Sequence, residues 1–89
     1  MAPCQHAIIS YQYYFEFESF TCNACRKDLL LDFHKIGLAW KKTQEPSYGQ
    51  FLTAERERRV NRAFGAGAWE RVKAQVTPVR ERHATPPTR

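Results

Sequence analysis

The sequence predicts a small α+β domain: an aromatic β-strand or hairpin, then about three helices and a disordered basic tail. From Ile9 to Glu18, apolar and more polar side chains alternate, which is the period-two pattern of a half-buried strand. After residue 26 the apolar residues recur at spacings of three and four, which indicates amphipathic helices. At 89 residues the chain forms one domain at most.

In the predicted strand, one face carries Ile9, Tyr11, Tyr13, Phe15 and Phe17, and the other carries Ser10, Gln12, Tyr14, Glu16 and Glu18. A hairpin needs a turn between Ile8 and Phe20. That stretch contains no Gly, Pro, Asn or Asp, the residues that favour turns. A single strand and a hairpin therefore both remain open.

Three helices follow in the prediction. Leu29, Phe33, Ile36 and Trp40 share one helical face, so the first helix is expected from about Arg26 to Lys42. A linker is expected over residues 43–50. The second helix is expected from Thr53, as its N-cap, to Phe64, and Gly65 ends it. The third helix carries Trp69, Val72 and Val76 and ends before Pro78. The expected organisation is one domain over 1–76, with a metal module at 4–42 and a helical extension at 51–76, then a flexible basic tail over 77–89.

Two short pairs of candidate metal ligands flank the aromatic segment. Cys4 and His6 form the first pair, Cys22 and Cys25 the second, and together they include every cysteine of the chain. Three thiolates and an imidazole are a ligand set typical of closed, tetrahedral structural zinc sites. We therefore expect Zn²⁺ as a structural staple, which a core of this size often requires.

Two alternatives concern the same residues. His34 could replace His6 as the fourth ligand, although an ordinary exposed position on a helix is the favoured explanation for it. A redox dithiol of Cys22 and Cys25 before a helix would resemble the thioredoxin arrangement. The further parallel strands of that fold are not predicted after residue 42.

The run from Cys4 and His6 through an aromatic β segment to Phe20, Cys22 and Cys25 resembles the small zinc-ribbon or treble-clef-type proteins of bacteriophages and bacteria. The resemblance covers residues 4–42 and implies a structural metal and a binding role. Zinc ribbons commonly carry Gly after the second C-x-x-C, where this chain has Arg26. That departure favours the treble-clef variant, in which the second ligand pair opens a helix.

Positive charge is concentrated in the second half. The net charge is +5; residues 1–50 hold five basic and five acidic side chains, whereas residues 51–89 hold nine basic and four acidic. The predicted second helix carries a candidate nucleic-acid-binding cluster of Arg56, Arg58, Arg59 and Arg62, with Asn61 able to reach a base edge. Glu55 and Glu57 lie between these arginines, so the segment also fits a solvent-exposed helix whose charged side chains form salt bridges with one another.

The aromatic residues Tyr11, Tyr13, Tyr14 and Phe15 are candidate partner-binding residues, because a strand with aromatics on both faces exposes more apolar surface than one small domain covers. Core packing is the simpler explanation for most of them.

These observations favour a non-catalytic zinc-binding regulatory module associated with nucleic acid through its basic helix and tail. The alternative is a protein–protein adaptor or inhibitor, such as one that a phage encodes, that docks on a larger host complex. No Gly-rich phosphate loop or catalytic constellation is present, and a closed zinc site leaves no position for water, so neither an enzyme nor a small-molecule substrate is expected. Without an apolar run of membrane-spanning length or a signal segment, a soluble, cytoplasmic protein without membrane contact is expected.

Overall fold

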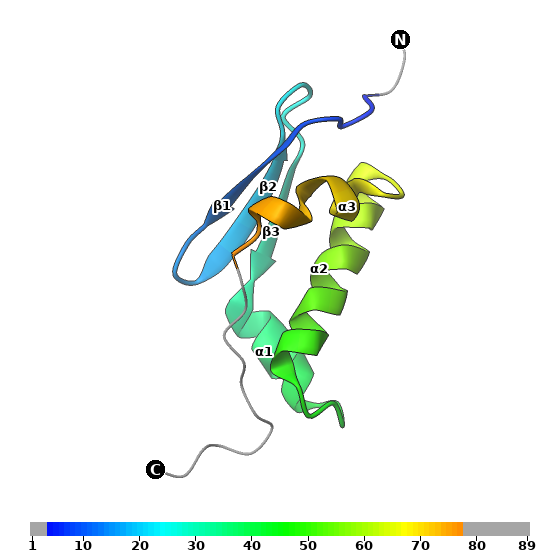
Figure 1. The fold of residues 1–89 in the computed structure, drawn as a ribbon. Helices are drawn as coiled ribbons and strands as arrows, with labels where there is room; N and C mark the ends of the chain where they lie inside the picture. Colours follow the sequence, from blue (N-terminus) through cyan, green and yellow to red (C-terminus); the bar gives the residue numbers. More distant parts are fainter. Residues whose placement is uncertain (1–3, 78–89) are drawn as a thin grey trace.

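The computed structural model describes residues 4–77 and shows an α+β fold with an antiparallel sheet of strand order β1-β2-β3 (Figure 1). The predicted fold class is confirmed to that extent. Helices α1 and α2 follow the sheet, and α3 and η1 run back across β1 (Figure 1). The elements are β1 (Ile9–Tyr13), β2 (Phe17–Cys22), β3 (Asp28–Asp32), α1 (Phe33–Lys41), α2 (Tyr48–Phe64), α3 (Ala68–Val72) and the 3₁₀ turn η1 (Lys73–Gln75). The tail predicted over 77–89 lies outside the described residues, apart from Thr77.

The aromatic segment is a hairpin. β1 pairs with β2 from Ile9 opposite Cys22 to Tyr13 opposite Glu18, and the N–H of Tyr14 donates to the carbonyl of Phe17 across the turn. The turn interrupts the predicted alternation, so the face that begins with Ile9 continues on β2 through Glu18 rather than Phe17. The sequence pattern was therefore wrong in placing Glu18 on the face opposite Ile9.

The first part of the helix predicted from Arg26 to Lys42 is a strand in the structure. Residues 28–32 form β3, which pairs with β2 from Thr21 opposite Asp28 to Phe17 opposite Asp32. Helix α1 begins only after Asp32, whose carboxylate accepts hydrogen bonds from two backbone N–H groups of the first turn. The apolar spacing that suggested one helix comes from β3 and α1 packing on the same core.

Helix α2 begins earlier than predicted. Ser47, not Thr53, is the N-cap, and its hydroxyl accepts from the N–H of Gln50 at 3.1 Å. The first turn of α2 therefore occupies the last three residues of the expected linker, 48–50. Its end is as predicted: Gly65 has φ of 106°, a left-handed conformation that favours glycine, and its N–H donates to the carbonyl of Asn61.

One core joins the sheet to the helices. The buried apolar residues come from all three strands and from α1, α2 and α3, and they form one cluster. On α2 the buried positions recur every four residues as Tyr48, Leu52, Arg56, Val60 and Phe64. Within the described part of the chain, no helix is long and apolar enough to cross a membrane.

A charged residue occupies the centre of that buried stripe. Arg56 is 4% exposed and pairs in bidentate geometry with Glu18, which is fully buried; Nε and Nη2 each lie 2.7 Å from a carboxylate oxygen. The hydroxyl of Tyr11 donates to the same carboxylate at 2.6 Å. Burial, followed by the hydrogen bond to Glu18, raises the pKa of Tyr11, so this hydroxyl stays protonated.

We expect Arg56→Met to destabilise the protein by about 3–5 kcal/mol, because it leaves the Glu18 carboxylate buried without its cation. Urea unfolding followed by circular dichroism measures the loss. Arg58→Met is the matched control: Arg58 forms an exposed pair on the same helix, and its loss should cost less than about 1 kcal/mol.

The double variant Glu18→Leu/Arg56→Met should recover much of the stability, because neither partner is then left as a buried charge. Equal costs for Arg56→Met and Arg58→Met would show that the buried pair has no special role.

Candidate functional site

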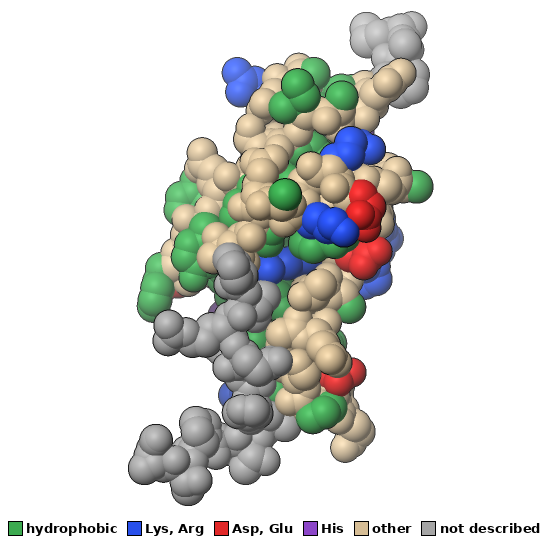
Figure 2. All heavy atoms as spheres, in the orientation of Figure 1, with side chains coloured by type: hydrophobic (Ala, Val, Ile, Leu, Met, Phe, Trp, Pro, Cys, Tyr) green, Lys and Arg blue, Asp and Glu red, His purple; other side chains and the backbone are tan. Residues whose placement is uncertain are grey.

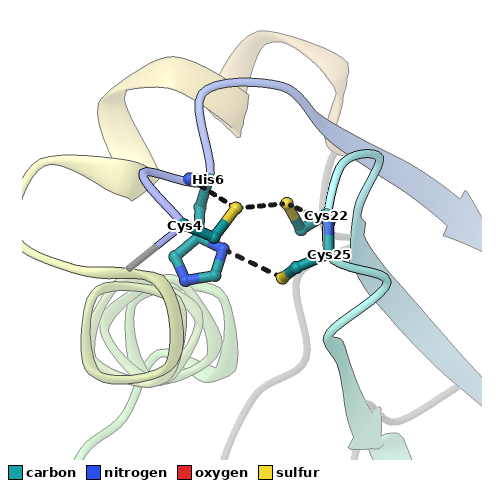
Figure 3. Close-up of side chains that lie close together, drawn as sticks. All are labelled: Cys4, His6, Cys22 and Cys25. Atoms are coloured by element: carbon teal, nitrogen blue, oxygen red, sulfur yellow. Dashed lines mark hydrogen bonds between the residues drawn. The ribbon is translucent and has the colours of Figure 1, made fainter. Parts of the chain in front are cut away.

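Four potential metal ligands meet at one end of the sheet. Cys4 and His6 come from the segment that precedes β1, Cys22 is the last residue of β2, and Cys25 lies in the turn to β3. One donor atom from each residue lies within 4.8 Å of all the others. The two thiols of the turn face Cys4 and the His6 ring (Figure 3). The structure thus brings together all four residues that the sequence predicted as ligands.

The shortest distances match the edges of a metal-centred tetrahedron. Cys4 Sγ and Cys22 Sγ lie 3.6 Å apart, and Cys25 Sγ lies 3.5 Å from His6 Nδ1. Metal–sulfur bonds of about 2.3 Å and metal–nitrogen bonds of about 2.1 Å place two sulfurs about 3.8 Å apart, and a sulfur and a nitrogen about 3.6 Å apart. A disulfide needs about 2.05 Å, and all three cysteines are free.

The local backbone shapes both ligand pairs. His6 and Arg26 have φ of 51° and 68°, and they are the non-glycine residues with positive φ in the described chain. In each pair, a backbone N–H points at the first sulfur: that of His6 at Cys4 Sγ and that of Cys25 at Cys22 Sγ. Such N–H groups stabilise thiolates, the form that binds metal.

The helix expected directly after Cys25 is a strand instead. The N–H of Arg26 donates to the carbonyl of Cys22, and the N–H of Cys22 donates to the carbonyl of Lys27, so the ligand pair closes a turn between β2 and β3. The prediction of a helix directly after the second ligand pair is therefore wrong. Arg26 itself adopts the left-handed conformation for which glycine is usually selected.

The Cys4 and Cys22 thiols influence each other's pKa. The backbone N–H of Cys25 contributes most to lowering the pKa of Cys22 to about 6, the His6 side chain acts in the same direction, and burial opposes both. For Cys4, the backbone N–H of His6 lowers the pKa, but burial and the neighbouring Cys22 and Cys25 thiols outweigh it, so the pKa is raised. One thiolate thus hinders ionisation of its neighbour, and a bound divalent cation would remove that conflict.

The N-terminal ligands are also held by the helices. The His6 ring packs edge-on against Phe64 at the end of α2, with 5.3 Å between ring centroids, and the guanidinium of Arg71 donates to the His6 carbonyl. The side-chain amide of Gln75 donates to the carbonyl of Ile9. His34 lies in the first turn of α1 and is not part of the cluster, so His6 supplies the imidazole.

The structure divides the predicted arginine cluster. Arg56 is buried against Glu18 and cannot contact a nucleic acid, which corrects its assignment as a nucleic-acid-binding residue. The side-chain oxygen of Asn61 is not available to a base edge either, because it accepts a hydrogen bond from the N–H of Trp69 at the start of α3. A sequence pattern cannot distinguish an arginine paired across the core from an exposed one.

The remaining arginines line a groove between α2 and the start of β3. Its lining consists of Lys27, Leu29, Arg58, Arg59, Arg62 and Ala63. We call this surface the basic groove. Lys27 was not among the predicted binding residues, because it lies in the neutral half of the sequence, far along the chain from α2.

The carboxylate of Glu55 partly neutralises the positive charge of the basic groove. Glu55 Oε1 accepts from Arg58 at 2.6 Å and from Arg59 at 2.9 Å. Burial opposes the shift, but the two guanidinium groups hold the pKa of Glu55 below its usual value, so it is ionised at neutral pH. Among the ion pairs of residues 4–77, none involves Lys27 or Arg62.

The predicted partner-binding aromatics differ in exposure. Tyr11 is half-buried, packs on Phe20 and donates to Glu18, so it belongs to the core, which corrects its assignment. Tyr13, Tyr14 and Phe15 lie at the β1–β2 turn and are 54%, 41% and 89% exposed. Hydrophobic side chains gather at this end of the hairpin (Figure 2).

Comparison of the chain with protein-family models, curated proteins and solved structures finds no match.

We expect His6→Gln to weaken binding of a divalent metal strongly and to remove one nitrogen ligand, because His6 supplies the fourth donor. Titration with Co²⁺ followed by absorbance checks this, since the titration gives the affinity and the d–d bands report the coordination geometry of the metal. His34→Gln is the matched control and should bind as the wild type does. Equal affinity of the His6 variant and the wild type would exclude His6 as a ligand.

Proposed function

We propose that Cys4, His6, Cys22 and Cys25 hold a structural Zn²⁺. Convergence of the four donor atoms within 4.8 Å, with one sulfur–sulfur distance of 3.6 Å and one sulfur–nitrogen distance of 3.5 Å, supports this most directly. Three thiolates and one imidazole suit zinc, and all four positions are filled by protein. When bound, the zinc supplies cross-linking of the N-terminal segment to the β2–β3 turn. The turn position of the second pair favours the zinc-ribbon side of the resemblance.

We further propose that the protein is a non-catalytic module that binds nucleic acid through the basic groove. The supporting observation is the arrangement of its charges: Arg58, Arg59, Arg62 and Lys27 line one surface, and none of the lining residues is a carboxylate. Guanidinium groups donate planar, paired hydrogen bonds that match phosphate oxygens. Helix α2 supplies three cations, and Lys27, the residue directly before β3, supplies a fourth.

The first experiment measures salt dependence. Fluorescence anisotropy with labelled single-stranded and duplex oligonucleotides should show affinity falling steeply with salt for at least one of them. Arg62→Gln should weaken binding and reduce the slope of log K against log salt by about 0.7–1, because one phosphate contact is lost. Lys35→Gln on α1 is the charge-matched control. Absence of salt-dependent binding to both oligonucleotides would reject the proposal.

Glu55→Gln should strengthen nucleic-acid binding, whereas Arg62→Gln should weaken it. Since Glu55 occupies Arg58 and Arg59 in the free protein, neutralising it should release both guanidinium groups and raise nucleic-acid affinity by about two- to tenfold at low salt. The same anisotropy titration measures this gain. Glu57→Gln, which removes an exposed carboxylate of the same helix outside the basic groove, controls for net charge. Equal gains in both variants would mean that the ion pairs of Glu55 do not compete with the ligand.

A protein–protein adaptor is the second candidate, and the exposed turn of the β1–β2 hairpin favours it. Phe15 is 89% exposed beside Tyr13 and Tyr14, and exposed aromatics of this kind anchor protein interfaces. Phe15→Ser should then abolish capture of a partner from nuclease-treated host lysate, while oligonucleotide binding stays unchanged. A nuclease-sensitive capture that tolerates Phe15→Ser would support nucleic acid instead.

A further inference from the structure

The basic groove has cations on two walls. Arg58, Arg59 and Arg62 rise from α2 on one side, and Lys27 comes from the start of the β3 side. Lys27 is held there by its own backbone, because its carbonyl accepts from the N–H of Cys22 at 2.9 Å. The positive charge of the groove therefore comes from two segments that are far apart in the sequence.

The groove also has apolar lining between those cations. Leu29 and Ala63 are half-buried, pack against the core and line the groove together with the charged residues. Apolar surface contributes nothing to phosphate binding, but it favours the faces of nucleobases or other apolar groups. Cations beside apolar surface thus fit a ligand that presents phosphates and apolar faces together.

We propose that the ligand of the basic groove is single-stranded nucleic acid, with its phosphates held by Lys27, Arg58 and Arg62 and a base lying on Leu29 and Ala63. This inference rests on the nucleic-acid function proposed above and names the form that is bound. A single strand leaves its bases unpaired, so that they can turn towards a protein surface.

A duplex does not fit the same arrangement. Its bases are stacked inside and present only their edges in the grooves, so Leu29 and Ala63 would face phosphates and sugars. Simple attraction to phosphate predicts the reverse order of affinity, because a duplex carries the denser charge. The two explanations can therefore be separated by one comparison.

The test uses the full-length, zinc-loaded protein and three labelled probes of about 15 units, within the site sizes of single-strand binders. They are a single strand of thymidine, an abasic strand with the same phosphodiester backbone, and a duplex of the same length. We expect the thymidine strand to bind at least about tenfold more tightly than the duplex at equal salt, and more tightly than the abasic strand, because only it offers bases to the apolar surface.

Lys27→Gln tests the second wall. It should weaken binding of the thymidine strand about three- to tenfold and reduce the salt slope by about 0.7, whereas Lys35→Gln leaves both unchanged. Lys27 is exposed and its backbone carbonyl is retained in the variant, so the fold should persist, and an unchanged circular dichroism spectrum and zinc content check this.

Each outcome decides a separate point. Duplex binding as tight as or tighter than thymidine binding would overturn single-strand recognition but leave the nucleic-acid function standing. Equal binding of the thymidine and abasic strands would overturn the base contact. Unchanged affinity in Lys27→Gln would overturn the two-walled groove. Failure of all three probes to bind would reject the proposed function itself.

Discussion

The buried pair of Glu18 and Arg56 fixes how α2 lies on the sheet. Both side chains are almost completely removed from water, and two parallel hydrogen bonds of 2.7 Å leave little freedom to rotate the helix or slide it along the sheet. An apolar contact at the same place would tolerate such adjustments, whereas a displaced ion pair leaves charges unpaired in the core. With Arg56 turned inward, Arg58, Arg59 and Arg62 can only lie on the flank and outer face, where they line the basic groove.

The ligand cluster and the helical half of the chain support each other. Phe64 packs on the His6 ring, and Arg71 and Gln75 donate to the backbone of the N-terminal segment. Cys4 and His6 precede the first strand, so these contacts attach a segment that lies outside the sheet. The division into a metal module and a helical extension therefore describes the order of the sequence, not two separately packed units, because a single core cluster spans both.

Local patterns in the sequence predicted those features that depend on neighbouring residues, and failed where distant residues decide. The ligand pairs, the end of α2 at Gly65 and the α+β class are visible as short motifs or periodicities. β3 was missed because Leu29 and Phe33 have helical spacing, although pairing with β2 makes the first of them part of a strand. The partner of Arg56 lies 38 residues away, and a turn without turn-forming residues reversed the expected orientation of Glu18.

The basic groove shows why charge counted along a sequence is a poor map of a protein surface. Lys27 belongs to the half of the chain that is neutral by count, yet it lies beside the arginines of α2, whereas Arg56 belongs to the basic half and contributes nothing to the surface. Lys27 reaches its place because the Cys22–Cys25 turn folds β3 back along β2, and the arginines reach theirs because Arg56 anchors α2. The basic groove is thus assembled by two features that are not part of its lining, the cluster of cysteines and His6 and the buried ion pair.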